Sequence, residues 1–366
     1  SMKPPGVALA LLAAFLLAAR SCHSGLIWVE EAYPAAAAIQ LLNGKLLYRD
    51  FWFDKPPLAP LIYLLWGARD GVVLRIAGAA FAFACCWVAW RLARELWSER
   101  EGLAAAGLTG FFLTFDTPSA ALALAPDLLM LLPHLAAVWL ARRGQPLAAG
   151  AMAGAAMLLN PKGAIVAAVC LLWIRRRDWL WLALGFAAVH GAGLAALWTS
   201  GAVGAYWRQV WVWGAVYSRD SFVDQPLLEG LRRTAAWAGF HAAIAIAAAW
   251  FWLGERSSES RRLALWTVAA LAGVVLGWRF FPRYYFILLP PVAIAASRGF
   301  TRMPRPAALA VAALLLDAFR RQGARERQGC ADLDYILRHG RTGHTGKNAR
   351  AHHGQRRLLA ERRIRQ

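Results

Sequence analysis

Residues that could do chemistry gather between the first apolar stretch of the sequence and the second. Glu30 and Glu31 come directly after the first stretch, and Lys55 precedes the pair Pro56-Pro57. A positioned carboxylate can take a proton from a hydroxyl group, and a positive side chain can neutralise a phosphate. This combination predicts a site for acid–base chemistry on a substrate that carries an anion.

Further polar residues in the same stretch add to this prediction. Tyr33 follows the acidic pair, Arg49 stands in Tyr48-Arg49-Asp50, and Asp54 precedes Lys55. For any single one of them, simple solvation at a membrane boundary is the alternative interpretation. Taken as a cluster within one loop, they favour a binding or catalytic site.

Three more ionisable residues fall within or beside apolar segments. An ionisable group inside a membrane span is costly and is by default a functional candidate. Asp127, in Leu124-Ala-Pro-Asp127, is our candidate for a second acid. Asp116 is the alternative, and it could instead cap the helix that follows. Lys162, in Asn160-Pro161-Lys162-Gly163, either helps to bind a phosphate or only ends a helix.

The elements that must position these residues are strongly apolar. The chain has 366 residues, of which 59% are hydrophobic and 17% charged, with 19 Trp. Since a bilayer core about 30 Å thick needs roughly 20 apolar residues per helix, we predict an all-α polytopic membrane protein with about eleven transmembrane helices. The predicted spans lie near residues 5–21, 72–90, 102–115, 119–141, 147–159, 163–174, 179–198, 234–253, 263–278, 284–297 and 306–317.

The short loops between these spans predict which way the chain crosses the membrane. With the N-terminus in the cytoplasm, every loop on that side carries arginines, such as Arg91 and Arg94 or Arg142 and Arg143. This is the positive-inside pattern. It places the two long loops, residues 22–71 and 199–233, on the outer face.

Loops of this length within a compact domain are usually functional. In the first, residues 35–42 favour a helix lying on the membrane surface, and Asn43-Gly44 supplies its stop signal. The second loop is rich in Trp and Tyr, which suit the headgroup layer and predict an interfacial groove.

Composition divides the chain into a membrane domain, residues 1–317, and a tail, residues 318–366. The tail holds 13 Lys or Arg and 4 Asp or Glu, so it contributes +9 of the net charge of +20. With almost no aromatic residues, it is predicted to be disordered. Because the other arginines mostly occupy short loops, the charge does not indicate nucleic acid, and we predict no nucleic-acid partner.

The order of features in the first loop resembles that of the C-type (GT-C) membrane glycosyltransferases, in the branch of the protein O-mannosyltransferases and lipid A aminoarabinose transferase. In that branch an acidic pair follows the first helix, and then come a tyrosine, a glycine-ended helix and a lysine before two prolines. The matching residues here are Glu30-Glu31, Tyr33, Leu42-Asn43-Gly44 and Lys55-Pro56-Pro57. The stretch from Arg279 to Tyr285, followed by Leu289-Pro290-Pro291, also resembles the late family segment that enters a span near the active site.

This resemblance implies a GT-C-like bundle and inverting transfer of a sugar from a polyprenyl-phosphate donor at the outer face of the membrane. The acceptor would be a hydroxyl or phosphate of a glycolipid, glycan or protein. The implied catalytic residues are Glu30 as base, Glu31 and Asp127, and the implied donor-phosphate residues are Lys55, Arg283 and Tyr284. The family usually has Asp where this chain has Glu30, so the carboxylate here stands on a longer arm.

We predict no required cofactor. Asp54 resembles a position that is acidic in the aminoarabinose transferase and can bind a metal there, which leaves a divalent metal open. No partnering histidine is identifiable among His23, His134, His190 and His241. The abundance of Ala, Arg and Trp is typical of a high-GC bacterial genome, so we predict a bacterial cytoplasmic membrane and undecaprenyl phosphate as carrier.

Two other functions fit a polytopic membrane protein. A transporter or flippase is expected to carry charges along several mid-membrane helices or paired broken helices, whereas here the charges gather at one face. A non-catalytic membrane scaffold is the second alternative, and it would keep its partners after Glu30 and Lys55 are changed.

Overall fold

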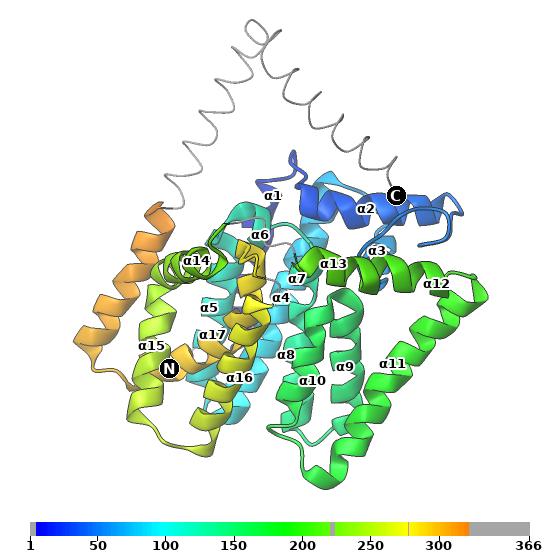
Figure 1. Ribbon diagram of the computed structural model, residues 1–366. Coiled ribbons are helices and arrows are strands. Elements are labelled where there is room, and N and C mark those ends of the chain that lie inside the picture. The colour runs from blue at the N-terminus through cyan, green and yellow to red at the C-terminus, as the bar shows by residue number, and fades with distance from the viewer. Residues whose placement is uncertain (1–4, 220–223, 277, 322–366) are drawn as a thin grey trace, which may run out of the picture. The chain divides into compact units, whose positions relative to one another are not determined.

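The computed structural model describes residues 5–219, 224–276 and 278–321, and these residues form helices and loops with no strand among them (Figure 1). The helices are α1 (Pro5–Ser21), α2 (Val29–Leu42), α3 (Leu58–Leu64), α4 (Gly71–Leu96), α5 (Glu99–Phe115), α6 (Pro118–Ala121), α7 (Pro126–Leu129), α8 (Leu131–Arg142), α9 (Pro146–Leu159), η1 (Pro161–Gly163), α10 (Ala164–Cys170), η2 (Arg176–Asp178), α11 (Trp179–Thr199), α12 (Val203–Tyr206), the π-helix η3 (Trp207–Val212), α13 (Trp213–Arg219), α14 (Pro226–Phe240), α15 (Ala242–Gly254), α16 (Ser258–Val275), the 3₁₀ helix η4 (Pro282–Leu288) and α17 (Leu289–Arg302). Residues 305–321 are also helical. The predicted all-α class is confirmed.

The chain separates into two compact units, residues 1–315 and 316–366. The first unit contains every candidate site residue. Most of the predicted tail, from residue 322 onward, lies outside the described residues, and so does the prediction that it is disordered.

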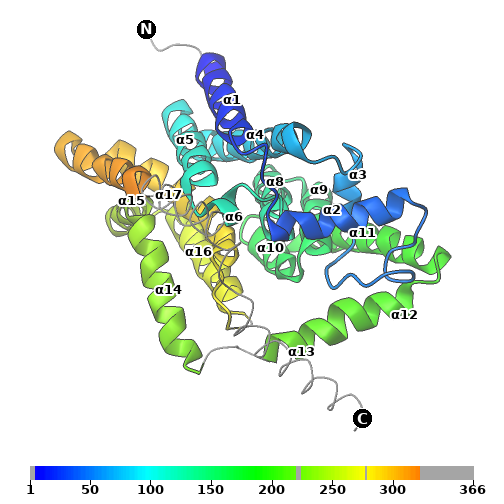
Figure 2. The same ribbon diagram turned by 90° about the horizontal axis from the view of Figure 1, so that it is seen from above.

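Within the first unit, α2 and α13 run roughly across the direction of α8 and α9 and lie toward the same end of them (Figures 1 and 2). The first turns of α4 and α8 lie at this end, which we call the site end. Their last turns, at residues 91–96 and 139–142, define the far end.

Some helices are long enough to cross a membrane unaided. By length and composition, α4 and the stretch Arg176–Thr199 qualify. The pair α14 and α15 qualifies when taken together, but it bends by 89° at its break. Other apolar helices in the described residues, such as α1 and α9, are shorter. The predicted number of spans therefore stays a prediction, and residues 234–253 do not form the straight span expected of them.

The predicted span over residues 119–141 is wrong. The structure divides it into α6, α7 and α8, with loops between them. Pro118 and Pro126 begin two of these short helices, and a residue before proline is pushed out of the helical region. As a result Asp127 lies in a broken segment and not within a continuous helix.

Close backbone contact fixes α9 against α11. A Cβ atom at Gly150 would lie 2.0 Å from the carbonyl oxygen of Leu182, and one at Gly185 would lie 2.0 Å from that of Leu147. Small residues at a crossing are how helices in membranes approach each other this closely. The tight packing holds α9, and therefore Asn160 at its C-terminal end, in a defined position.

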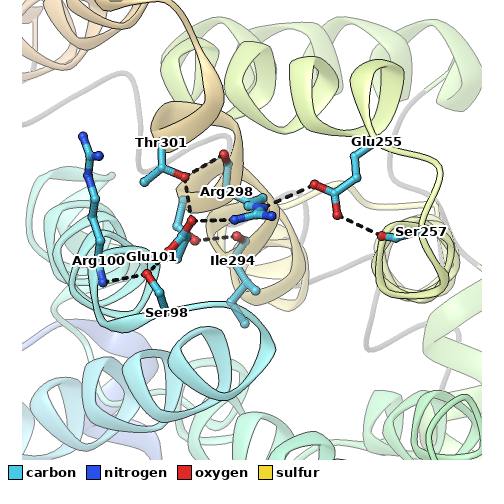
Figure 3. Close-up of polar contacts among 9 residues, drawn as sticks. Ser98, Arg100, Glu101, Glu255, Ser257, Ile294, Arg298 and Thr301 are labelled. Atoms are coloured by element: carbon cyan, nitrogen blue, oxygen red, sulfur yellow. Dashed lines mark hydrogen bonds and ion pairs between the residues drawn. The ribbon is translucent and has the colours of Figure 1, made fainter.

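A polar cluster at the far end joins α5 to α17 (Figure 3). The Glu101 carboxylate accepts hydrogen bonds from Arg298 Nη1 at 2.8 Å, from the Thr301 hydroxyl at 2.9 Å and from the Ser98 hydroxyl. Arg298 Nε also faces Glu255 Oε2 at 3.3 Å. Burial opposes ionisation of Glu101, but these hydrogen bonds outweigh it and lower its pKa to about 2. We call these five residues the far-end cluster.

Candidate active site

Helix α2 presents both acids of the first loop in its first turn. It extends the predicted helix over 35–42 toward the N-terminus, beginning at Val29. The predicted stop is confirmed, since Asn43 is the C-cap and Gly44 has a φ of +76°, which favours glycine. The positive end of the helix dipole stabilises negative charge in the first turn. Glu30 and Glu31 share this first turn, but their side chains have different surroundings.

The Glu31 side chain is fully buried, and both of its carboxylate oxygens have hydrogen-bond donors. It pairs with Arg75 of α4, and it accepts hydrogen bonds from the backbone N–H groups of Trp28 at 3.1 Å and Leu124 at 3.2 Å. Both members of the ion pair have almost no exposed side-chain surface. A carboxylate saturated in this way holds the structure together. This geometry favours Glu30 over Glu31 as the base.

Buried donors also fix the broken segment that carries Asp127. Arg20, fully buried at the end of α1, donates to the carbonyl oxygens of Ala121 at 2.8 Å and Leu122 at 3.0 Å. The Tyr63 hydroxyl donates to the Leu124 carbonyl at 3.0 Å. Pro126 has no N–H to donate to the Leu122 carbonyl, and the break in the helix leaves the other two carbonyls without helical partners. An unpaired buried carbonyl costs free energy. Side chains from other helices therefore replace the missing helical hydrogen bonds.

Three predicted site residues come together at the site end. Arg283 Nη1 donates to Glu30 Oε1 at 2.9 Å, and Arg283 Nε lies 3.6 Å from Asp127 Oδ2. The other oxygen of Asp127 accepts a hydrogen bond from the Asn160 side-chain amide at 2.9 Å. Glu30 and Arg283 are each more than a quarter exposed, whereas Asp127 is buried. One guanidinium thus bridges two carboxylates that lie far apart in the sequence.

Lys162 and Tyr284 lie beside this bridge. The Lys162 ammonium nitrogen is buried and sits 3.1 Å from the centroid of the Tyr284 ring. No acceptor among the described residues lies within hydrogen-bond distance of that nitrogen. Burial lowers the pKa of Lys162 to about 8, with Asp127 opposing this shift and Arg283 adding to it. A buried cation with free donors is suited to binding an anion. We call Glu30, Asp127, Asn160, Lys162, Arg283 and Tyr284 the site cluster.

Backbone strain precedes the helix that carries Arg283. Trp278 and Phe280 have φ values of +52° and +46°, in a region that costs free energy for residues with side chains. Arg233 of α14 donates to the carbonyl oxygen of Arg279 at 2.9 Å. A Cβ atom at Gly230 would lie 2.4 Å from the Phe280 ring, so only glycine admits that ring. Helix α14 thus braces the turn into η4.

Lys55 belongs to a second polar group in the first loop. Its ammonium nitrogen lies 2.9 Å from Asp54 Oδ2, and the Tyr33 hydroxyl donates to Asp54 Oδ1 at 2.9 Å. Burial raises the pKa of Tyr33 well above its ordinary value, so the hydroxyl stays a donor. Tyr33 lies three residues after Glu30 on α2, a spacing that places both on one helix face. This links Lys55 to the helix that presents Glu30.

Two predicted candidates lie outside these groups. Arg49 pairs with its neighbour Asp50 at 3.0 Å on an exposed loop. Asp116 accepts a hydrogen bond from the Thr117 backbone N–H at 2.6 Å and faces His241 Nε2 at 3.4 Å. Asp116 is the C-cap of α5, and Thr117 is the N-cap of α6, so the alternative in which Asp116 caps the following helix is not borne out. Among the described residues, no group of three or more His, Cys, Asp or Glu side chains could hold a metal ion.

Sequence reasoning missed several residues that shape this end. Arg20 and Arg75 were not singled out, although each stands beside or within an apolar stretch, which is a signal of a functional or buried charge. Asn160 was noted only as part of a helix break. Arg233 gave no sequence signal, since a basic residue in a long polar loop is ordinary.

Comparisons with known proteins agree with this architecture. A family model described as dolichyl-phosphate-mannose-protein mannosyltransferase matches residues 54–202. The crystal structure of ArnT from Cupriavidus metallidurans bound to undecaprenyl phosphate aligns with a TM-score of 0.58 and 18% identity, covering 90% of this chain and 64% of that one. The apo oligosaccharyltransferase of Archaeoglobus fulgidus aligns with a TM-score of 0.55 and 16% identity, covering 87% and 55%. The search of curated proteins gave no match.

The predicted resemblance is therefore confirmed: the chain has the fold of the GT-C membrane glycosyltransferases. Within that class, residues 54–202 match the mannosyltransferase family. The chain spans less than two thirds of the length of either solved structure.

Proposed function

We propose that this protein is an inverting glycosyltransferase that moves a sugar from a polyprenyl-phosphate donor to an acceptor hydroxyl or phosphate. The observation that carries the proposal is the bridge of Arg283 between Glu30 and Asp127, at the site end of a GT-C fold. It combines a partly exposed carboxylate with a cation, which are the groups that this transfer needs.

Glu30 acts as the general base. Its carboxylate takes the proton of the acceptor hydroxyl while the acceptor oxygen attacks the anomeric carbon. The bond from that carbon to the phosphate oxygen breaks, and polyprenyl phosphate leaves with the bonding electrons. An incoming phosphate competes with Glu30 for Arg283, so binding of the donor frees the carboxylate to accept a proton.

Cations stabilise the departing phosphate. Arg283 offers a planar guanidinium suited to phosphate oxygens, and Lys162 offers an ammonium group that has no hydrogen-bond acceptor among the described residues. Lys55 is the third candidate, held by Asp54 at the first loop. Tyr284 keeps the Lys162 ammonium group over its ring. Asp127 faces Nε of the same guanidinium whose Nη1 contacts Glu30.

An apolar cavity provides space for a hydrocarbon chain near the first loop. It has a volume of about 350 Å³ and is lined by residues of α11, α12 and η3. Pro57, two residues after Lys55, also lines it. A phosphate bound by Lys55 would therefore have an apolar path for its lipid. This also supports the predicted groove of the aromatic second loop, to which Trp207 and Trp211 belong.

The location and partners follow from the same reasoning. The positive-inside pattern puts the site end on the outer face of the cytoplasmic membrane, as expected for a bacterial inner-membrane enzyme. The donor is a polyprenyl-phosphate sugar, and undecaprenyl phosphate is the carrier bound to the similar ArnT structure. A glycolipid, glycan or protein is the acceptor.

The test is transfer of label by purified protein. Radiolabelled polyprenyl-phosphate sugars and a membrane extract as acceptor are supplied to wild type, Glu30→Gln and Glu259→Gln. Glu259, at the start of α16, is the matched control because its contacts are with Ser258, Arg262 and, at longer range, Arg142, none of which belongs to the site cluster. We expect Glu30→Gln to lose at least about a hundredfold in rate, with the control unchanged.

The outcomes separate the roles. Transfer unchanged in Glu30→Gln would move the base to another carboxylate, with Asp127 the first to examine. If wild type neither consumes nor binds any labelled donor, the glycosyltransferase proposal fails, and transport or a scaffold role replaces it.

A further inference from the structure

The far end carries a second charged surface that plays no part in the proposed reaction. Its residues come from the C-terminal parts of two neighbouring helices, α4 and α8, and from the residue after α8, and they combine four arginines with three tryptophans. They are Arg91, Arg94, Arg142, Arg143, Trp87, Trp90 and Trp139. We call them the Arg–Trp surface.

This surface lies far from the site cluster. Arg75, the fifth residue of α4, contacts Glu31 at the site end, and Arg91 follows sixteen residues later on the same helix. At 1.5 Å per residue this places Arg91 roughly 24 Å farther along the axis. The hydrocarbon core of a bilayer is about 30 Å thick. The Arg–Trp surface therefore stands near the headgroup layer opposite the candidate active site.

Three indole rings enclose one guanidinium. The Arg91 guanidinium carbon lies 5.7, 5.8 and 5.5 Å from the ring centroids of Trp87, Trp90 and Trp139. Trp87 and Trp139 also meet edge to face at 5.6 Å. Each ring attracts the cation, and together they hold it in place. Arg91 is thus fixed at the interface, whereas an arginine that only extends toward water would be mobile.

The carboxylates here are too few for the arginines. Glu95 and Glu99, with Glu259 near Arg142, face four guanidinium groups. A single oxygen, Glu95 Oε1, accepts the Trp139 indole N–H at 3.1 Å and lies 3.5 Å from Arg91 and 4.0 Å from Arg143. Contacts of 3.5 Å and longer are weak hydrogen bonds at best. Arg91 and Arg143 therefore keep N–H donors available.

The other two arginines have closer partners. Arg142 donates to the carbonyl oxygen of Glu95 at 3.0 Å, and Arg94 lies 3.1 Å from Glu99. The first contact ties the end of α8 to the end of α4, and the second ties α4 to the start of α5. Arg91 and Arg143 therefore offer the N–H donors with the weakest partners, and their side chains are 29% and 42% exposed.

We propose that the Arg–Trp surface binds the headgroup of an anionic phospholipid, with Arg91 and Arg143 on the phosphate and the indole rings in the headgroup layer. Guanidinium groups bind phosphate oxygens through paired hydrogen bonds. Tryptophan favours the membrane interface, and basic pockets between membrane helices bind anionic lipids. This lipid is neither donor nor acceptor in the proposed transfer.

The experiment compares lipids retained by the purified full-length protein in native mass spectrometry. Wild type is incubated with equal amounts of dioleoyl phosphatidylglycerol and dioleoyl phosphatidylcholine. The variant is Arg91→Gln/Arg143→Gln, and the matched control is Arg175→Gln/Arg176→Gln. The control removes two exposed arginines from the turn before α11, at the same end of the helices.

We expect wild type and the control to retain phosphatidylglycerol at least about tenfold over phosphatidylcholine, and the variant to lose that preference. Arg143→Gln alone, which disturbs little packing, should lower retention severalfold if the double variant fails to fold.

Equal retention of the two lipids by wild type would overturn the proposal. An equal loss in the control would also overturn it, because it would show general attraction of positive charge. A last arm adds inorganic phosphate, and displacement of the lipid at millimolar phosphate would assign the site to a free anion.

Discussion

The site cluster and the far-end cluster are built from the same types of residue, but their polar groups are satisfied to different degrees. At the far end, the Glu101 carboxylate accepts hydrogen bonds from three side chains, and Arg298 lies between two carboxylates. At the site end, counting only the described residues, Glu30 has one side-chain partner and the Lys162 ammonium group has no acceptor, while Arg283 contacts Glu30 at 2.9 Å and Asp127 at 3.6 Å. Saturated polar groups hold helices together, whereas unsaturated ones leave room for a substrate.

The strongest test of this comparison is to remove the bridging cation. In Arg283→Gln we expect kcat/KM for label transfer to fall about a hundredfold to a thousandfold, the loss typical when a charge-stabilising donor is removed. The thermal midpoint should change little, because this side chain is more than a quarter exposed. Steady-state kinetics and thermal unfolding in the same detergent check both. A fall of less than tenfold would mean that Lys55 and Lys162 suffice for the phosphate.

The mirror experiment is made at the far end. Arg298→Gln breaks a largely buried pair, and we expect it to cost about 3 kcal/mol of stability while transfer at low temperature persists. The lowered pKa of Glu101 adds a pH signature. Because the pKa of Glu101 is lowered from 4.5 to about 2, its ionised carboxylate stabilises the folded protein above pH 4.5. This stability is lost as the pH falls toward about 2. Denaturant unfolding across pH values measures this. Unchanged stability would show that the far-end cluster does not hold α5 to α17.

A smaller effect is expected when the packing of Gly230 on Phe280, which supports the turn into η4, is disturbed. Gly230→Ala places a methyl group 2.4 Å from the Phe280 ring, so the turn into η4 must shift. We expect kcat/KM to drop about tenfold, since an error of about an ångström in a catalytic group is expensive. Gly239→Ala, on the same helix, meets nothing within 4 Å and is the matched control. Equal activities would show that the strained turn does not set the position of Arg283.

The smallest effect is a pH dependence. Because the pKa of Lys162 is lowered from 10.5 to about 8, kcat/KM should fall severalfold as the pH rises through about 8 and the ammonium group loses its proton. Lys162→Arg should abolish this fall, while Lys45→Arg, on an exposed turn, should keep it. The native state loses this proton before the unfolded chain does, so stability should rise between pH 8 and 10.5. A flat activity profile in wild type would remove Lys162 from the phosphate site.

Sequence patterns found local features better than they found partners. The apolar run over residues 5–21 matches α1, and Asn43 with Gly44 marks the end of α2. These signals are carried by neighbouring residues. The sequence did not predict the break within residues 117–130, although prolines mark it. The reason is that the span was assigned from its apolar composition and length alone.

Differences between adjacent acids could not be read from the chain. Glu30 and Glu31 look alike in sequence, yet only the structure shows that Arg75 and the Leu124 N–H saturate Glu31. Arg283 was predicted for the phosphate, while its contact with Glu30 depends on packing across the whole unit. Such pairings are set by tertiary structure, for which one sequence gives no local signal.

The contact between Glu30 and Arg283 joins residues 253 positions apart, and this has a consequence for biosynthesis. At roughly 5–20 residues per second, a ribosome needs about 13 to 50 seconds to add that much chain. During this interval the first loop is already made, but its cation does not yet exist. If Arg283 binds the donor phosphate as proposed, the nascent protein cannot bind it fully until its last helices are inserted, and a chain that ends before Arg283 is expected to be inactive.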